Sequence, residues 1–319
     1  MGKICTHGFA AAALLALALA GCSGERGADA DEQARIAAAA AANAAFAARQ
    51  DAWRAERHER LVAPDGWTGL IGLYWIELDA HYLGSSRDSG MRLSKGPPRL
   101  GLVQQDRGRL FFTPERGVEL TVDGEPLKRR IELHDDRSQT PTLIDFDGGL
   151  GQLGVIERAG RRALRVRHEQ APARMAFTGI DYWPADASWR VEGRFVAHQP
   201  GQTLDVASIV GGTEAMANPG VVEFERDGQA YRLQALDDGA GGLFLILADR
   251  TSGQGSYGAG RYLDAAAPDT DGRVVLDFNR AYNPPCAFTN YATCPLPPLE
   301  NRLDLAITAG EKAHAPPPG

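Results

Sequence analysis

Residues 249–301 contain side chains whose types and spacing could bind or transform a small molecule. An arginine here could hold an anion through two parallel hydrogen bonds. An aspartate could act as a general base, and a tyrosine could donate a proton or stack on a ring. We interpret Asp277 and Tyr257 as the candidate catalytic residues. The candidate ligand-binding residues are Arg261, Ser252, Asn279, Tyr282, Asn283 and Asn301.

Two interpretations of these polar residues stay open. Polar groups between buried strands must either satisfy one another's hydrogen bonds or face a ligand. In the first case Asp277 pairs with Arg261, the asparagines cap turns, and the tyrosines fill the end of a barrel. In the second case the same groups surround an open pocket.

Cys286 and Cys294 lie in the same stretch, flanked by prolines. In an exported protein, two cysteines this close are typical of a structural disulfide, which we predict here. A free nucleophilic thiol and a metal site are the alternatives. Zinc sites favour closer cysteine pairs with further ligands nearby, so no metal or cofactor is expected. The histidines are scattered singly, and neither a G-x-S-x-G nor an H-E-x-x-H motif occurs.

Gly253, Gly255 and Gly258 match the glycine pattern of dinucleotide-binding loops. Such a loop must open a helix whose N-terminus faces the pyrophosphate. Only a short segment separates Gly258 from Pro268, so the surroundings do not favour a nucleotide site. The glycines are better explained by tight turns that need a positive φ.

The formal net charge is −7, and 44% of the residues are hydrophobic. This composition is sufficient for a large core in one or two domains. An acidic surface repels phosphate backbones, so nucleic acid is not an expected partner. The oligomeric state cannot be inferred from the composition.

Residues 1–21 have the features of an export signal, with Lys3 ahead of an apolar run over residues 9–20. The sequence Leu19-Ala20-Gly21-Cys22 resembles a bacterial lipobox. That resemblance implies cleavage before Cys22 and attachment of lipid chains such as palmitate, which anchor a protein to a membrane. It predicts a lipoprotein of the cell envelope that faces the periplasm. Ser23 favours the outer membrane over the inner one, and an ordinary secretory signal is the alternative.

Residues 22–62 form the predicted linker, and alanine dominates its middle part. Alanine has the highest helix propensity, and the run contains no proline before Pro64. We therefore predict one helix over residues 31–61, with a flexible linker as the alternative. Its few large apolar residues predict that only the end near Trp53 packs against the rest of the chain.

The remainder is predicted to be mainly β, as two packed β-rich units of the sandwich or barrel kind, over residues 63–170 and 171–312. The tail, residues 313–319, is predicted to be disordered. Short apolar runs broken by Asp-Gly turns predict the strands. In the first unit these runs cover residues 67–76, 109–112, 118–122, 131–133, 142–146, 153–157 and 163–167. In the second they cover residues 189–197, 203–210, 221–225, 230–235, 243–248, 274–278 and 303–307.

Residues 99–101 and 122–124 resemble parts of forkhead-associated sandwiches, which bind phosphothreonine. The Ser-x-x-His element of that family is absent, and Asp123 stands where the family uses asparagine. Phosphopeptide binding is therefore not expected.

A second resemblance covers more of the chain. Residues 257–263, 277–288, 293–298 and 300–303, with the Asn283-Pro-Pro-Cys286 block among them, resemble the prokaryotic family called domain of unknown function 1684. Residues 53–57 and 65–67 are similar to its opening. The resemblance implies kinship over about residues 53–312 and no established activity.

These observations predict a protein that binds a small polar or anionic ligand in a pocket of the second β-rich unit. A hydrolase or transferase that uses Asp277, Tyr257 and Arg261 is the first alternative. The second is a structural envelope lipoprotein without a pocket.

Overall fold

The structure is a computed structural model that describes residues 23–314. The predicted signal peptide, the lipidated Cys22 and residues 315–319 of the predicted tail lie outside this range. Among the described residues, 23–49 and 50–314 belong to two separate units. The last three turns of the N-terminal helix belong to the larger unit.

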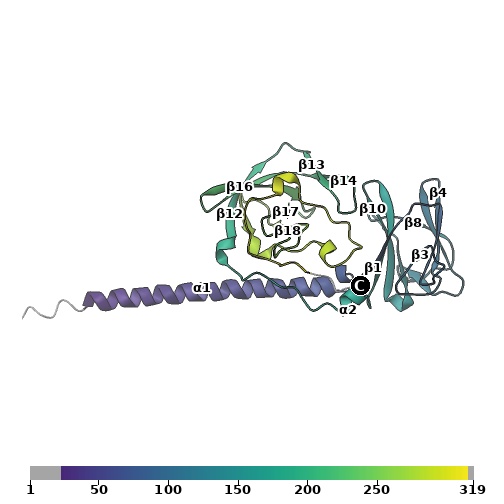
Figure 1. Ribbon diagram of the computed structural model, residues 1–319, viewed down its shortest axis with the longest axis horizontal. Coiled ribbons are helices and arrows are strands. Elements are labelled where there is room, and N and C mark those ends of the chain that lie inside the picture. The colour runs from purple at the N-terminus through teal and green to yellow at the C-terminus, as the bar shows by residue number, and fades with distance from the viewer. Residues whose placement is uncertain (1–22, 315–319) are drawn as a thin grey trace, which may run out of the picture. The chain divides into compact units, whose positions relative to one another are not determined.

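The N-terminal helix α1 covers Ser23–Val62 as one uninterrupted element (Figure 1). Its 40 residues reach about 60 Å at 1.5 Å per residue. Residues 31–45 expose their side chains, as the alanine-rich sequence predicts. The predicted helix is confirmed and begins earlier than expected, while the flexible-linker alternative is wrong. The helix ends just before Pro64, because proline disfavours helical backbone in the residue that precedes it.

Among the described helices, none is long and apolar enough to cross a membrane.

The first β-rich unit consists of two sheets. One has the order β1(Leu70–Trp75), β11(Arg161–His168), β10(Gly151–Arg158), β9(Leu143–Phe146), β6(Leu120–Val122) and β7(Glu125–Pro126). The other has the order β3(Met91–Arg92), β2(Ala80–Gly84), β4(Gly101–Asp106), β5(Arg109–Pro114) and β8(Ile131–Leu133). Asp123 and Gly124 join β6 to β7 with φ of 52° and 79°, the left-handed values that a tight two-residue hairpin requires.

One apolar cluster joins the two sheets of this unit. Leu83, Val103 and Phe112 come from the second sheet, and Ile144 and Leu164 from the first; all five are completely buried. The predicted strands of this unit are confirmed. The sequence patterns missed β2, β3 and β4, where polar and glycine residues interrupt the apolar positions, and the two-residue strand β7.

The second unit contains a six-stranded sheet and a hairpin. The sheet has the order β18(Arg261–Ala265), β17(Leu243–Leu247), β16(Gln229–Asp237), β15(Gly220–Arg226), β12(Arg190–Ala197) and β19(Arg273–Asp277). Its edge strands β18 and β19 approach each other, so the sheet curls into a partial barrel. The hairpin pairs β13(Thr203–Ala207) with β14(Thr213–Ala217). One apolar cluster fills the curled sheet, with Leu233, Leu245 and Phe278 completely buried.

One predicted strand of this unit is wrong. Residues 303–307 belong to no strand, and the chain bends at Asp304 and Leu305. The amide of Leu303 donates to Ala248 O at 2.8 Å, and Arg250 N donates to Leu305 O at 2.9 Å. These contacts continue along irregular backbone beyond the end of β17, so no regular ladder forms.

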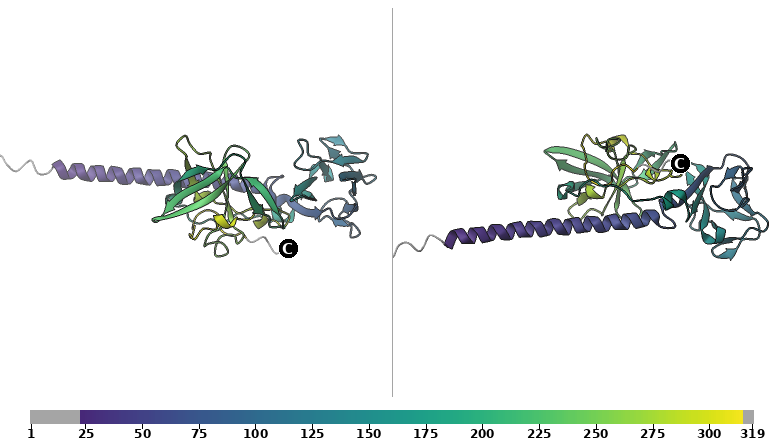
Figure 2. Two further views of the ribbon diagram at one scale, coloured as in Figure 1. Left: turned by 90° about the horizontal axis from the view of Figure 1, so that it is seen from above. Right: turned by 60° about the horizontal axis from the view of Figure 1, so that its bottom comes forward.

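Short helical turns complete the fold. They are α2(Pro172–Met175), η1(Trp67–Gly69), η2(Asp147–Gly149), η3(Ala187–Trp189), η4(Phe278–Arg280), η5(Pro285–Ala287) and η6(Leu299–Asn301). Figure 2 shows the blue-to-teal strands of the first unit and the green-to-yellow strands of the second as two distinct groups. The predicted class, mainly β with a preceding alanine-rich helix, is confirmed.

Candidate functional site

The last turns of α1 present one face to the second β-rich unit. Gln50, Trp53, Arg57 and Leu61 recur at intervals of three or four residues, the spacing that aligns side chains along one helix face. Gln50, Arg57 and Leu61 are buried. Gln50 Nε2 donates to Asp277 Oδ2 at 3.0 Å. The prediction that the helix packs at its Trp53 end is consistent with these contacts.

A buried ion pair fixes this helix face. Arg57 Nε donates to Glu311 Oε1 at 2.8 Å, and Arg57 Nη2 donates to Asn283 O at 2.9 Å. The second oxygen of Glu311 accepts the Asn283 amide at 2.6 Å. Burial raises the pKa of Glu311, while the charge of Arg57 acts in the opposite direction. The helix end is thereby joined to the C-terminal segment, 254 residues away in the chain.

A cavity of about 300 Å³ lies against this helix face. Five aromatic side chains line it, and three charged residues and one proline complete the wall. The lining residues are Trp53, Trp67, Phe244, Tyr262, Tyr282, Arg57, Arg60, Asp264 and Pro285. The Tyr262 ring lies edge-on to the Phe244 ring at 4.9 Å and to the Tyr282 ring at 5.8 Å. We call this cavity the aromatic pocket.

The charged groups of the aromatic pocket are close to one another. Tyr282 donates its hydroxyl to Asp264 Oδ1 at 3.1 Å, and the Arg57 guanidinium carbon lies 4.8 Å from the centre of the Tyr282 ring. Burial raises the pKa of Asp264, although the side chain still reaches solvent. The Tyr282 hydrogen bond and the charges of Arg60 and Arg57 oppose that rise. Burial raises the pKa of Tyr282 as well, so this hydroxyl remains a donor at neutral pH.

Replacing Asp264 with asparagine is expected to raise thermal stability slightly at neutral pH. The folded pKa of Asp264 lies above its unfolded value, so the folded state favours the neutral carboxyl. The contribution of Asp264 to stability is therefore fully present below its unfolded pKa and is lost as the pH rises through the folded pKa. Melting curves at pH 7 and pH 4 check this, since the advantage of Asp264→Asn should shrink at pH 4. A variant that melts below the parent at pH 7 contradicts the expectation.

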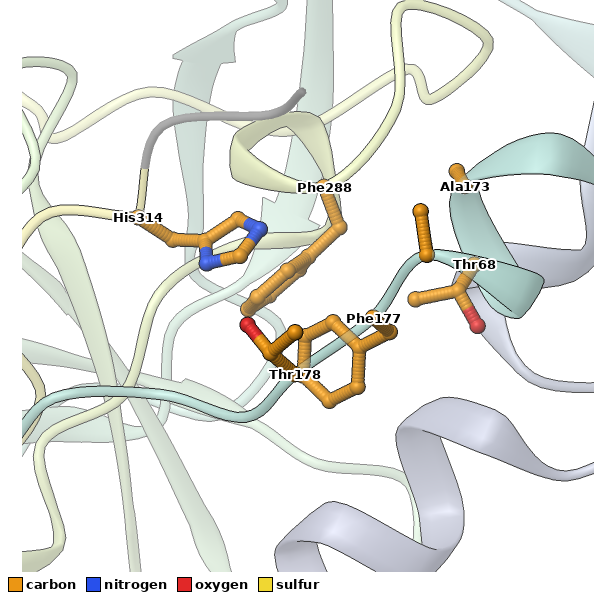
Figure 3. Close-up of a pocket in the computed structure, with 7 residues that line it drawn as sticks. Thr68, Ala173, Phe177, Thr178, Phe288 and His314 are labelled. Atoms are coloured by element: carbon orange, nitrogen blue, oxygen red, sulfur yellow. The ribbon is translucent and has the colours of Figure 1, made fainter.

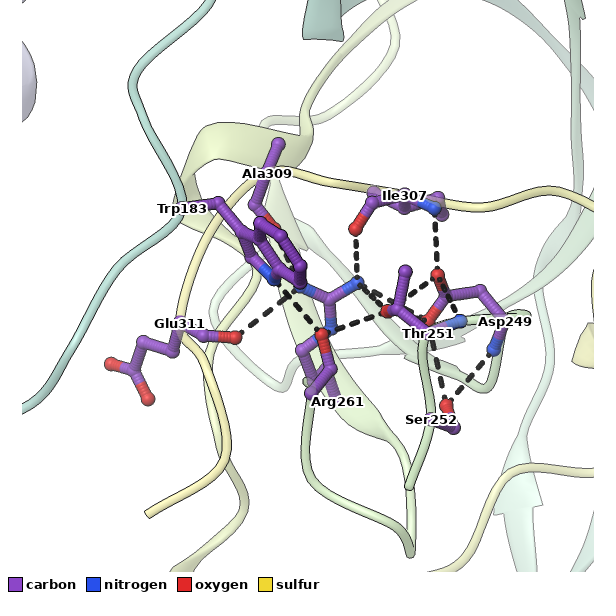
Figure 4. A network of polar contacts seen from close by, with 9 residues as sticks. Trp183, Asp249, Thr251, Ser252, Arg261, Ile307, Ala309 and Glu311 are labelled. Atoms are coloured by element: carbon purple, nitrogen blue, oxygen red, sulfur yellow. Dashed lines mark hydrogen bonds and ion pairs between the residues drawn. The ribbon is translucent and has the colours of Figure 1, made fainter. Parts of the chain in front are cut away.

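Arg261, the predicted anion-binding residue, is completely buried at the start of β18. Its Nη2 donates to Asp249 Oδ1 at 3.2 Å and to Ile307 O at 2.9 Å, and its Nη1 donates to Ala309 O (Figure 4). Burial lowers the pKa of Arg261, and the neighbouring Asp249 partly restores it. Arg261 thus joins β18 to the C-terminal segment and does not line the aromatic pocket, so its position does not support the predicted binding role.

Asp277, the predicted base, accepts hydrogen bonds at both carboxylate oxygens. Oδ1 accepts from the Asn279 amide at 3.2 Å and from Asn279 Nδ2 at 2.9 Å, and Oδ2 accepts from Gln50. Asp277 caps the turn η4 and does not pair with Arg261, whose carboxylate partner is Asp249. Arg261, Asp277 and Tyr257 therefore do not meet around an open space, and their positions do not support a joint catalytic role.

Most of the remaining predicted residues form hydrogen bonds within the fold, and one lines the aromatic pocket. Asn283 Nδ2 donates to Lys312 O at 2.7 Å, and Asn301 Nδ2 donates to Ile246 O at 2.9 Å. Ser252 accepts the Asp249 amide at 3.1 Å, and Tyr257 donates to Cys286 O at 3.2 Å. Asn279 exchanges two hydrogen bonds of 2.9 Å with the backbone of Asp186. Of the predicted set, Tyr282 alone lines the aromatic pocket.

The two C-terminal cysteines are neighbours, as their spacing predicts, and no covalent bond joins them in the structure, so the disulfide stays a prediction. The Cys286 amide donates to Cys294 Sγ at 3.0 Å. The hydrogen bond between the two thiols lowers the pKa of Cys286 and raises that of Cys294.

A second cavity, of about 240 Å³, lies near η1 and α2 (Figure 3). The rings of Phe177, Phe288 and His314 pack against one another, and the His314 ring lies 5.0 Å from the Phe288 ring. Burial lowers the pKa of His314. No carboxylate or guanidinium is among the described residues that line this cavity, so the aromatic pocket has the richer set of binding groups.

Within residues 23–314, no cluster of histidine, cysteine or acidic side chains has the arrangement of a metal site.

Several pocket residues were missed by the sequence patterns. Trp53, Arg57 and Arg60 lie at the helix end that was expected to pack, but none was assigned to a site, although their spacing places them on one face. In β18, Asp264 is the exposed position of an otherwise buried strand, and a single charged residue among apolar ones could have indicated a site residue. Trp67 was assigned to a buried strand and instead begins η1.

Parts of this chain are similar to two solved structures. An uncharacterized protein of Haloarcula marismortui, solved by solution NMR, is 36% identical; the match covers 44% of this chain and 78% of that protein, with a TM-score of 0.36. The N-terminal FHA domain of EssC, a component of the bacterial Type VII secretion apparatus, is 13% identical; the match covers 32% of this chain and 47% of that one, with a TM-score of 0.25. Both TM-scores are too low to inform the fold.

Comparison with curated proteins finds no match. Residues 175–312 match the family described as Protein of unknown function (DUF1684). This range includes the Asn283-Pro-Pro-Cys286 block, while the residues that resemble the family's opening lie outside it. The chain therefore belongs, through residues 175–312, to the DUF1684 family.

Proposed function

We propose that this protein binds a small organic molecule that contains a ring in the aromatic pocket. The observation that carries the proposal is the composition of the wall, with five aromatic side chains together with Arg57, Arg60 and Asp264. A cavity of about 300 Å³ has the size of a small-ligand site, and aromatic walls with a few convergent polar groups are typical of such sites.

The pocket also has the rigidity that selective binding needs. Tyr262 donates its hydroxyl to Pro295 O at 2.9 Å, and Tyr282 donates to Asp264. The Arg57–Glu311 pair holds the helix that forms one wall. Groups held in place by other bonds lose little conformational entropy when a ligand binds.

Tryptophan fluorescence can test this proposal, since Trp53 and Trp67 line the pocket. We expect at least one compound from a panel of benzoate, 4-hydroxybenzoate, phenol, glucuronate and glucose to change the emission in a saturable way. The change should decrease in Trp53→Phe and Trp67→Phe. It should persist in the control Trp75→Phe, because Trp75 lies on β1 and does not line the pocket.

A panel that leaves the emission unchanged, confirmed by calorimetry, would count against the binding proposal. An emission change that is equal in all three variants would place the compound elsewhere on the protein. In either case the aromatic pocket would be a packing feature of the helix end.

We further propose that the chain is a lipoprotein of the cell envelope, attached through lipid on Cys22 and facing the periplasm from the outer membrane. The support is the Leu19-Ala20-Gly21-Cys22 sequence behind an apolar run, with Ser23 following the cysteine. Two or more acyl chains are enough for stable anchoring without a membrane span.

Metabolic labelling with an alkyne analogue of palmitate in a bacterial host tests the lipid anchor. The full chain should be labelled and should fractionate with the outer membrane, whereas Cys22→Ser should lose the label and the membrane association. Cys5→Ser is the matched control, since Cys5 lies inside the predicted signal peptide, and it should behave like the parent. Labelling that survives in Cys22→Ser would refute the assignment.

A further inference from the structure

We infer that the ligand of the aromatic pocket is a hydroxylated ring compound with an anionic group, held by Arg57 and Arg60 at the anion and by Asp264 at a hydroxyl. This inference rests on the proposed binding function and adds the chemical class of the ligand. A sugar acid and an aromatic hydroxy acid share this chemistry.

The first step is the unused hydrogen-bonding capacity of Arg57. Its guanidinium donates from Nε to Glu311 and from Nη2 to Asn283 O. No partner for Nη1 is found among the described residues, although the residue is only 8% exposed and lines the pocket. This donor is not fully buried, so it can exchange water for a ligand oxygen, and a hydrogen bond from the charged guanidinium is stronger than one between neutral groups.

The second step concerns charge. Glu311 already balances the charge of Arg57. Arg60, in the last turn of α1, adds a positive charge that no residue in the described range balances by an ion pair. Both arginines favour the charged form of Asp264, so all three groups lie close enough to interact. An anionic group on the ligand is therefore attracted to the arginine side of the pocket.

The third step concerns Asp264. Its Oδ1 accepts the Tyr282 hydroxyl, and within residues 23–314 no donor to Oδ2 is found. A carboxylate oxygen accepts hydrogen bonds and repels an anion. The part of the ligand that faces Asp264 must then carry a donor such as a hydroxyl, and this orients the anionic group toward Arg57 and Arg60.

The fourth step concerns the ring. Trp53, Trp67, Phe244, Tyr262 and Tyr282 form the apolar part of the wall. Flat faces of this kind pack well against a ring, whether aromatic or saturated, and poorly against a flexible open chain. The aromatic wall and the charged groups together favour a compact ring that carries an anionic group and a hydroxyl.

Calorimetric titration with two series of compounds tests the inference. The first is 4-hydroxybenzoate, benzoate and phenol, and the second is glucuronate and glucose. We expect the acid with a hydroxyl to bind about tenfold or more tightly than the member that lacks either group, since one charge-assisted hydrogen bond accounts for about a factor of ten. The series that binds identifies which ring is preferred.

Variants assign each contact. Arg60→Ala should weaken the acids about tenfold and leave phenol or glucose unchanged. Asp264→Asn should weaken the hydroxylated compounds and leave benzoate unchanged. Arg232→Ala, an exposed arginine on β16 that does not line the pocket, is the control and should bind like the parent.

The outcomes separate this inference from the proposed function. Neutral ring compounds that bind as tightly as the acids, with a tryptophan response, would overturn the ligand class and leave the binding function intact. An Arg60→Ala variant with unchanged affinity for the acids would likewise overturn the anion assignment. Absence of binding by every ring compound in both series would count against the binding function itself.

Discussion

The variant Arg261→Met should lower the free energy of unfolding by about 3–5 kcal/mol, because it leaves the charge of Asp249 buried without its partner. Both side chains of this ion pair are completely buried. Arg261 also donates to three backbone carbonyls of the C-terminal segment, those of Ile307, Ala309 and Glu311. Methionine keeps the length of the side chain and removes these donors. For a domain of this size, the melting temperature should fall by roughly 10 °C.

Urea denaturation of Arg261→Met and of a matched control measures the effect. The control is Arg250→Met, which removes an arginine from the exposed ion pair with Asp304 nearby in the same unit. An exposed pair contributes about 0–1 kcal/mol, so this variant should remain close to the parent. Equal stability of the two variants would contradict the structural role assigned to Arg261.

Coupling between the two buried residues provides a second check. Asp249→Asn alone should also destabilise the fold, since Asp249 accepts from Arg261, from Thr251 Oγ1 at 2.8 Å and from the Ile307 amide at 2.7 Å. The double variant should lose less than the sum of the two single losses, because each single change leaves the other charge buried alone. Strictly additive losses would show that the two groups do not act as a pair.

The variant Glu311→Ala should have an effect of similar size, about 3–5 kcal/mol, and should release the end of α1. Glu311 is completely buried and accepts hydrogen bonds from Arg57 and from the Asn283 amide. Alanine leaves both donors buried without an acceptor. Since Arg57 is the main charged contact on the buried helix face, the helix end should then open more often than the sheets.

Hydrogen exchange read by mass spectrometry measures this release. Amides of residues 50–61 should exchange faster in Glu311→Ala, while those of β10 and β11 should change little. Glu311→Gln keeps an oxygen that can accept the Asn283 amide and should lose less. The exposed Glu300→Ala is the control and should exchange like the parent. Uniform acceleration over the whole chain would mean that Glu311 supports global stability without a specific effect on the helix.

The sequence was a reliable guide where structure depends on neighbouring residues. Alanine propensity predicted α1, and alternation of apolar and polar residues with Asp-Gly turns predicted most strands. The Asn283-Pro-Pro-Cys286 block indicated the family that residues 175–312 match. Cys286 and Cys294 lie next to each other, as their spacing predicted, while the disulfide between them stays a prediction.

The candidate site shows where local patterns were insufficient. Residues 249–301 are rich in polar groups, and the sequence could not separate groups that support the fold from groups that face a cavity. Most belong to the first kind, as Arg261 and Asp277 show, while Tyr282 belongs to the second. The difference depends on which side of a strand or turn each residue occupies after the sheet has curled.

By itself, the sequence determined the helical and β-rich segments of this protein and its kinship, because propensity, periodicity and motifs act over a few residues. The tertiary structure alone decided which polar groups form hydrogen bonds within the fold and which remain free to bind a ligand. The pocket joins Arg57 and Arg60 of α1 to Asp264 of β18 and Tyr282 of the loop beyond β19. Contacts across more than 200 residues, such as Arg57 with Glu311, arise only when the packed core brings distant segments together.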